Sequence, residues 1–188
     1  MTCIVGIEGK NTVWLGGDSA ATAGDGSQTL IADKKVFVNA NGEVIFGICG
    51  SPKLIDPLRY TVFAKQKRGE DNREFVATVL VPMIKHALKE SGCVTEHPEH
   101  GEHFQGEVLF GVGGKLYRMQ SNFQLITDSQ GYASVGSGSD IAIGSLHATR
   151  RDSNARRRIL TALEASALAN AGVRPPFAIV SVRKGWFR

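Results

Sequence analysis

The chain opens with MTCIVGIEGKNTVWLGGD, residues 1–18, and this stretch decides the fold. Two short β-rich runs, 2–7 and 12–15, flank a polar turn that contains a glycine, so they predict an antiparallel hairpin at the N-terminus. Thr2 begins this hairpin and becomes the first residue if Met1 is removed. A terminal threonine carries a hydroxyl nucleophile and a free amine that can act as its base. The stretch therefore predicts a β-rich first third and a candidate nucleophile.

Downstream, blocks of strands alternate with pairs of helices. Apolar residues recur with helical spacing from Phe75 to Leu88, where Pro82 is expected to kink the helix or to remove one backbone hydrogen bond. Residues 20–29 are small and polar and are expected to form a loop. Helices are predicted at about 51–67, 75–91, 140–149 and 153–171, and further strands at 35–39, 43–49, 107–112, 115–120, 123–127, 133–135 and 177–182. Strands grouped in blocks favour an α+β fold over a doubly wound one. We expect two packed sheets with a helix pair on each outer face, in a single domain over residues 1–188.

Composition excludes several classes of protein. With 42% hydrophobic and 21% charged residues, the 188-residue chain is typical of a globular protein, and no apolar run approaches the length of a membrane span. Cys3, Cys49 and Cys93 are too few and too widely spaced for a disulfide framework. We therefore expect a cytoplasmic protein without a secretory signal or a membrane partner. The basic residues at 150–158 are interpreted as a solvated helix face, not as a nucleic-acid site.

A histidine-rich segment leaves one alternative open. His97, His100 and His103 lie close together in the sequence, with Cys93 nearby, and these ligand types suit zinc. The surrounding connector, 93–105, is polar and favours an exposed insertion. A metal-dependent hydrolase is the alternative function that this segment keeps in view.

Four short motifs follow Thr2 in a fixed order: Gly16-Gly17-Asp18, Lys34-Lys35-Val36, Cys49-Gly50-Ser51 and Gly136-Ser137-Gly138. Through their order and spacing, the chain resembles a proteasome β subunit, and more closely the bacterial HslV-type peptidase and its small bacterial or phage relatives. The resemblance is strongest in residues 2–51 and 133–149. It implies an N-terminal-nucleophile hydrolase with a four-layer αββα sandwich.

The resemblance implies a role for each matching residue. Thr2 is the expected catalytic nucleophile, and Asp18 is expected to orient a catalytic lysine, Lys35. A nearby ammonium favours the neutral form of the α-amine and stabilises negative charge on the threonine oxygen. Counting from Thr2 without a gap selects Lys34 instead. Adjacent strand residues face opposite ways, so one of the two lysines points at Thr2, and Cys3 is expected to point into the core.

Two later segments complete the implied site. Gly50 matches the glycine whose backbone N–H faces the developing oxyanion, a donor worth about 3 to 4 kcal/mol in such sites. Ile48 and Cys49, just before it, are expected to line the substrate pocket. Ser137 matches a serine beside the threonine amine, where it helps to relay the proton. The segment at 171–177 departs from the family, because it lacks an Asp that many proteasome subunits carry there.

The sequence thus predicts a threonine endopeptidase that needs no metal or organic cofactor. The resemblance implies a peptide or unfolded-protein substrate, a homo-oligomeric ring with its sites inside a chamber, and a separate ATPase partner. The chain itself has no Gly-x-x-x-x-Gly-Lys-Ser/Thr phosphate-binding motif. A non-catalytic assembly protein with the same fold is the second alternative. Joint retention of Thr2, Asp18 and Lys35 argues against it, since an inert subunit has no physical need for all three.

Overall fold

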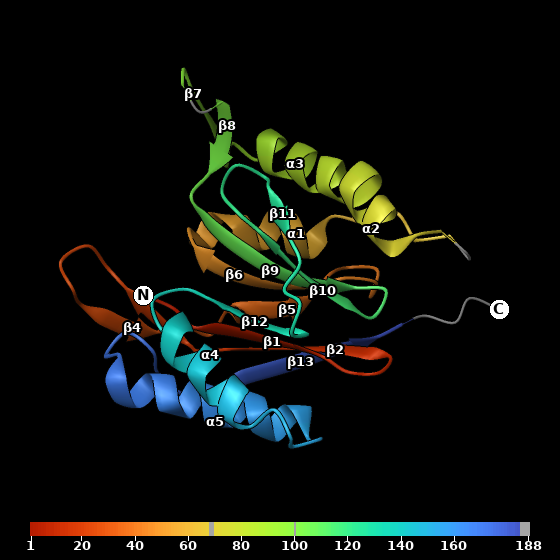
Figure 1. Ribbon diagram of the computed structural model, residues 1–188. Helices are drawn as coiled ribbons and strands as arrows, with labels where there is room; N and C mark the ends of the chain where they lie inside the picture. Colours follow the sequence, from red (N-terminus) through yellow and green to blue (C-terminus); the bar gives the residue numbers. More distant parts are fainter. Residues whose placement is uncertain (68–69, 100, 185–188) are drawn as a thin grey trace.

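The computed structural model describes residues 1–67, 70–99 and 101–184. In Figure 1 four layers lie one above another: helices, a five-stranded sheet, a four-stranded sheet and a second layer of helices. The predicted α+β class and the αββα sandwich are confirmed. None of the helices within these residues combines the length and hydrophobicity that a membrane crossing needs.

The four-stranded sheet has the N-terminal hairpin at its centre. Its strands are antiparallel and follow the order β12, β1, β2, β13. Their bounds are Ile4–Glu8 for β1, Thr12–Gly17 for β2, Tyr132–Val135 for β12 and Ala178–Arg183 for β13. Ile4 pairs with both Gly17 and Val135. Thr2, Asp18 and Ser137 therefore follow or precede their strands at the same end of this sheet.

The five-stranded sheet supplies the other inner layer. Its strands are also antiparallel and follow the order β11, β10, β9, β6, β5. Their bounds are Val36–Val38 for β5, Ile45–Gly50 for β6, Gly106–Val112 for β9, Lys115–Met119 for β10 and Leu125–Ile126 for β11. Lys35 immediately precedes β5, at an outer edge of this sheet, and its carbonyl accepts a hydrogen bond from Ile48.

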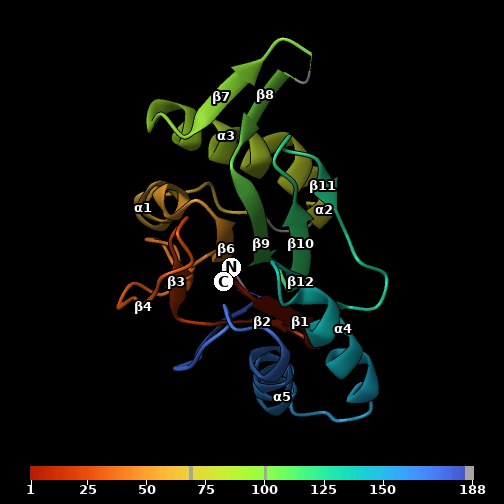
Figure 2. The same cartoon turned by 90° about the vertical axis from the view of Figure 1, so that its left-hand side faces the viewer.

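Helices cover both outer faces, as Figure 2 shows end-on. The four-stranded sheet is covered by α4 (Ser139–Ala148) and α5 (Ala155–Ala169). The five-stranded sheet is covered by α1 (Ile55–Tyr60), α2 (Asn72–Phe75), a π-helix (Val76–Leu80) and α3 (Val81–Glu90). Leu80, Ile84 and Leu88 recur every four residues and are fully buried against this sheet, which is the amphipathic pattern read from the sequence.

Two of the predicted helices differ from expectation. The first is shorter than predicted. It begins with a 3₁₀ turn at Pro52–Leu54, continues as α1 and ends at Thr61, whose backbone is extended. Thr61 and Val62 are β-branched and favour that conformation. The second helix contains a π-helical turn immediately before Pro82. The amide of Val81 bonds to the carbonyl of Val76, five residues back, and Pro82, which lacks an amide proton, follows in the first turn of α3.

Two segments expected to be loops contain hairpins. Residues 20–29 include β3 (Ala20–Thr22), which pairs with β4 (Gln28–Leu30). The connector at 93–105 forms β7 (Val94–His97) and β8 (Gly101–Phe104), which project beyond α3 in Figure 1. Both hairpins are too exposed and polar to show the alternation of apolar residues that marks a half-buried strand.

The two sheets approach closely behind the N-terminus, because glycines face the opposite layer. A Cβ on Gly17 would lie 2.9 Å from Cδ1 of Ile4 and 3.0 Å from Cγ1 of Val36. A Cβ on Gly47 would collide with Ile4, and Ile4 and Val36 are fully buried between the sheets. Gly17 and Val36 are the chain neighbours of Asp18 and Lys35, while Ile4 pairs with Gly17 and Gly47 pairs with Val36. The contact between the layers thus supports the region where those polar side chains meet.

Candidate active site

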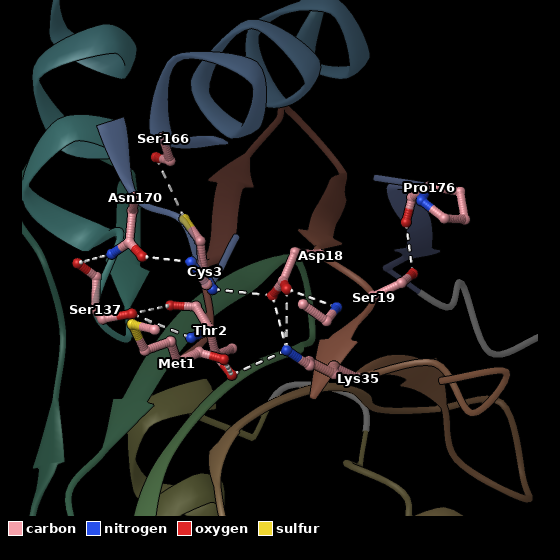
Figure 3. A network of polar contacts seen from close by, with 12 residues as sticks. Met1, Thr2, Cys3, Asp18, Ser19, Lys35, Ser137, Ser166, Asn170 and Pro176 are labelled. Atoms are coloured by element: carbon pink, nitrogen blue, oxygen red, sulfur yellow. Dashed lines mark hydrogen bonds and ion pairs between the residues drawn. The ribbon is translucent and has the colours of Figure 1, made fainter. Parts of the chain in front are cut away.

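Lys35 connects the two sheets at the N-terminal end of the sandwich. Its Nζ donates to Oγ1 of Thr2 at 3.0 Å and to the two carboxylate oxygens of Asp18 at 2.9 and 3.1 Å (Figure 3). The side chain is buried, whereas Lys34 is exposed and its carbonyl accepts a hydrogen bond from Arg59. Of the two lysines considered from the sequence, the structure brings Lys35 to Thr2.

Asp18 is buried with a full set of partners. Besides Lys35, its carboxylate accepts the backbone amides of Cys3 at 3.0 Å and Ala20 at 2.9 Å. A buried carboxylate without such partners is costly, whereas one that is paired and fully bonded is held in a single orientation. Asp18 therefore fixes the position of the Lys35 ammonium, which is the geometry its predicted role requires.

Thr2 is held through both its side chain and its backbone. Its Oγ1 accepts from Lys35 and donates to the carbonyl of Met1 at 2.7 Å. Its amide donates to Oγ of Ser137 at 3.2 Å, and its carbonyl accepts from the amide of Gly138 at 3.2 Å. The structure thus brings Ser137 to the nitrogen that becomes the α-amine when Met1 is removed.

Ser166 of α5 and Asn170, the residue that follows this helix, support this loop and were not predicted from the sequence. Ser166 donates to the carbonyl of Gly138 at 3.0 Å, and Nδ2 of Asn170 donates to the carbonyl of Ser137 at 2.9 Å. The two residues are four apart and therefore lie on one face of the helix end. Asn170 also accepts the amide of Gly172 at 3.0 Å. The sequence signal was an asparagine at the C-terminus of a predicted helix, which by itself indicates a cap.

Gly50 ends β6 beside this loop. It is exposed, has φ of +111° and pairs with Gly106. Cys49 is half-buried, and its sulfur would lie 3.1 Å from a Cβ on Gly136, so β6 reaches the loop that holds Thr2. Ile48 is 3% exposed within the core under α1 and α3, so little of its side chain faces a substrate in this structure. The roles of Gly50, Cys49 and Ile48 stay predictions.

The two cysteines near Thr2 are poor competitors as nucleophiles. Burial raises the pKa of the Cys3 thiol, and burial followed by the nearby Glu107 raises the pKa of Cys49. Since the thiolate is the reactive form, both side chains remain protonated at neutral pH. Cys3 is fully buried and donates to Ser166, as expected for a core residue.

Met1 lies over the site in the unprocessed chain. Its side chain contacts Gly172 so closely that a Cβ there would collide with Met1. This contact holds Met1 in place, and the Met1 carbonyl accepts the hydrogen bond that the Thr2 hydroxyl donates.

Comparisons with known proteins show where this fold occurs. No protein-family model matches the chain, and none of the curated proteins matches it in sequence. Solved structures do match over nearly the whole chain. BPH from Thiobacillus denitrificans is 17% identical, with a TM-score of 0.76 over 99% of this chain and 100% of that one. Eukaryotic HslV from Trypanosoma brucei is 16% identical, with a TM-score of 0.69 over 97% and 99%.

The fold is that of the proteasome-like N-terminal-nucleophile hydrolases. Anbu, the ancestral β-subunit from Yersinia bercovieri, has it as well, with 12% identity and a TM-score of 0.61 over 97% of this chain and 82% of that one. One of the BPH structures is a complex with epoxomicin. At such low identities the likeness establishes the fold, and the chemistry must be argued from this chain's own residues.

The described part of the histidine segment forms no metal site. Across residues 1–67, 70–99 and 101–184, no three His, Cys, Asp or Glu side chains converge to bind a metal ion. His97 and His103 lie near each other on β7 and β8, with ring centroids 6.2 Å apart. His100 lies outside the described residues.

Proposed function

We propose that the protein is a threonine endopeptidase whose nucleophile is Thr2, exposed by removal of Met1. The observation that carries the proposal is the position of the Lys35 ammonium, bonded to both Oγ1 of Thr2 and the carboxylate of Asp18. A buried lysine placed against a hydroxyl stabilises the negative charge that develops on that oxygen.

Removal of Met1 changes the site in two useful ways. The Met1 carbonyl no longer accepts the Thr2 hydroxyl proton, and the Thr2 nitrogen becomes a free amine beside Ser137. That amine takes the hydroxyl proton, directly or through one water, as Oγ1 attacks the carbonyl carbon of a peptide bond. Lys35 stabilises the attacking oxygen, and Ser137 orients the amine.

The remaining steps follow from the same groups. The Gly50 amide is proposed to donate to the oxyanion of the tetrahedral intermediate. The protonated amine gives its proton to the leaving peptide nitrogen, and the Thr2 ester remains. Water, activated by the same amine, attacks the ester and releases the acid, which restores the Thr2 hydroxyl. None of these steps calls for a metal or an organic cofactor.

The substrate and assembly follow by analogy with proteins of this fold. We propose a peptide or unfolded-protein substrate, cleaved by a homo-oligomeric ring of single-domain subunits with an ATPase as delivery partner. The likeness to HslV and to an ancestral β-subunit supports this part of the proposal.

A peptide epoxyketone such as epoxomicin tests the nucleophile directly, because it reacts with both the hydroxyl and the amine of an N-terminal threonine. Intact mass spectrometry of the treated protein should show loss of Met1 and one inhibitor per chain. The Thr2→Ala variant should lose Met1 and stay unmodified, and Thr2→Ser should react. A wild-type chain without Met1 that stays unmodified in its assembled state would refute the peptidase, as would equal modification of Thr2→Ala.

A further inference from the structure

A second candidate site lies at the opposite end of strand β1 from Thr2. A cavity of about 780 Å³ opens between the β1–β2 turn, the end of β13 and the start of α5. In Figure 1 these three segments meet near the C-terminal side of the molecule, away from the end labelled N. Nothing in the proposed peptidase mechanism uses them.

The cavity is lined by four basic residues and no acidic one. Lys10 comes from the turn, Arg156 from the first turn of α5, and Arg183 and Lys184 from the end of β13. All four are exposed, and within the described residues none of their side chains makes an ion pair or hydrogen bond. The first turn of α5 carries no acidic residue that would offset them.

Acidic side chains near this end are already engaged by other cations. Asp152 binds Arg157 through two hydrogen bonds, of 2.6 and 2.7 Å. Glu8 binds Lys115 at 3.2 Å and also accepts the amide of Leu116 at 2.9 Å. Within the described residues, the positive charges at the cavity therefore have no acidic partner, which favours an anionic ligand with more than one charge.

Trp14 adds an aromatic wall to the same cavity. Its side chain is half-buried, packing in part against the core between the four-stranded sheet and α5 while also lining the cavity. An indole anchored in this way offers a flat apolar face on which a planar ring can stack. The polar side chains of Asn11, Thr12 and Ser153 complete the wall with hydrogen-bonding groups.

We propose that this cavity binds a nucleotide, with the base against Trp14 and the phosphates among Lys10, Arg156, Arg183 and Lys184. Clustered cations alone suit any polyanion, but a cavity with an aromatic wall favours a small ligand that combines a planar ring with phosphate groups. The site would be a binding site separate from the peptidase centre, and its test does not depend on peptidase activity.

Calorimetry and tryptophan fluorescence of the whole protein with ATP, adenosine and inorganic phosphate test the proposal. Since Trp14 and Trp186 are the two tryptophans, the Trp186→Phe variant reports on Trp14 alone. We expect ATP to bind and change the Trp14 emission, and adenosine and phosphate each to bind at least tenfold more weakly. Absence of binding at millimolar ATP would overturn the proposal, and phosphate binding as tight as ATP would refute the role of Trp14.

A charge-matched pair of double variants separates a built site from general basicity. Arg156→Gln with Arg183→Gln should weaken ATP binding at least tenfold and flatten its salt dependence. Arg150→Gln with Arg151→Gln removes the same charge from the neighbouring surface outside the cavity, and should change binding less than twofold. Equal losses in both pairs would show non-specific attraction and contradict the proposal. Unchanged melting temperatures confirm that both variants fold.

Discussion

At the Thr2 end of strand β1 the cation Lys35 is buried and bonded to Asp18. At the other end Lys10, Arg183 and Lys184 are exposed and have no carboxylate partner among residues 1–67, 70–99 and 101–184. A buried, fully bonded charge has one position, and removing either partner leaves the other stranded in the core. Exposed cations keep their hydration and their freedom, so removing one changes little besides the local potential. Basic side chains are therefore held in one position at the Thr2 end and remain mobile at the other end.

The largest effect should come from adjacent lysines that differ in burial. Lys35→Met leaves Asp18 buried without its counter-ion, so we expect a loss of about 3 to 5 kcal/mol in the free energy of unfolding. Peptidase kcat/KM should fall by at least about 10³-fold, because the charge opposite the Thr2 oxygen is gone. Denaturant titration and a fluorogenic peptide assay measure the two losses.

Lys34→Met is the matched control. It removes the same charge one residue earlier on an exposed side chain, and should cost no more than about 0.5 kcal/mol. A larger activity loss at position 34 than at 35 would contradict the arrangement described above.

Gly50→Ala should have the next largest effect. With φ of +111°, a Cβ at this position would lie 2.5 Å from Cα of Gly106 in the neighbouring strand. Backbone strain of about 1 to 3 kcal/mol adds to that clash, and displacement of β6 should move the proposed oxyanion donor. Gly42→Ala is the control, since its φ is +76° with no atom within 4 Å of the added Cβ. If both variants lose stability and activity equally, strain alone explains Gly50.

Asn170→Ala tests the support behind Ser137. Losing the donor to the Ser137 carbonyl should lower kcat by about 10- to 100-fold with little change in KM, about 1.4 to 2.7 kcal/mol in the barrier. Asn170→Asp, which keeps the shape but cannot donate, should not restore kcat. Leu168→Ala, on the same turn and 91% exposed, should behave as wild type. An Asp variant with full kcat would show that the hydrogen bond is dispensable.

The smallest effect concerns the β7–β8 hairpin and depends on pH. Hydrogen bonds from Lys85 and Lys89 lower the pKa of the Glu102 carboxyl to about 2. A lowered pKa means that this contact contributes fully above the ordinary carboxyl range near 4.5 and is lost as the pH falls toward 2. Because solvent screens charges at this surface, the contribution of these contacts to stability is small.

Hydrogen exchange of the hairpin amides between pH 6 and 3 measures this loss, after correction for intrinsic rates. Glu102→Gln should show fast hairpin exchange at every pH. Glu96→Gln, at the facing position on β7, is the control and should retain the wild-type pH dependence. A hairpin with no pH dependence would mean that packing alone holds it.

Sequence reasoning predicted the layers well, because the helix at 75–91 and the N-terminal hairpin carry strong local periodicity. It also selected Lys35 through the family's motif register, which required an extra residue between Thr2 and the lysine. The β3–β4 hairpin lies in that interval. Its residues are small and polar, so the local sequence pattern does not indicate a pair of strands. Catalytic roles for these residues still rest on the experiments above.

Asn170 shows what sequence reasoning could not predict. Many proteasome subunits carry an Asp just after this helix, so the sequence was examined for an acidic residue there. Asn170 was therefore not considered. The contact joins residues 33 positions apart, so no local pattern indicates it. It follows from where α5 ends in space, which depends on the packing of the whole helix pair.

The glycines between the sheets give the sandwich a further property. Thr2 extends from one sheet and Lys35 from the other. The spacing of the two sheets therefore determines the length of the hydrogen bond between Lys35 and Thr2. Ile4, Gly17, Val36 and Gly47 set that spacing at the point directly behind the site. A methyl group added at Gly47 would push the two sheets apart. It would thereby change the turnover of the proposed enzyme without contacting a reacting atom. Selection for the rate of such an enzyme would then also act on the size of the side chains between its two sheets.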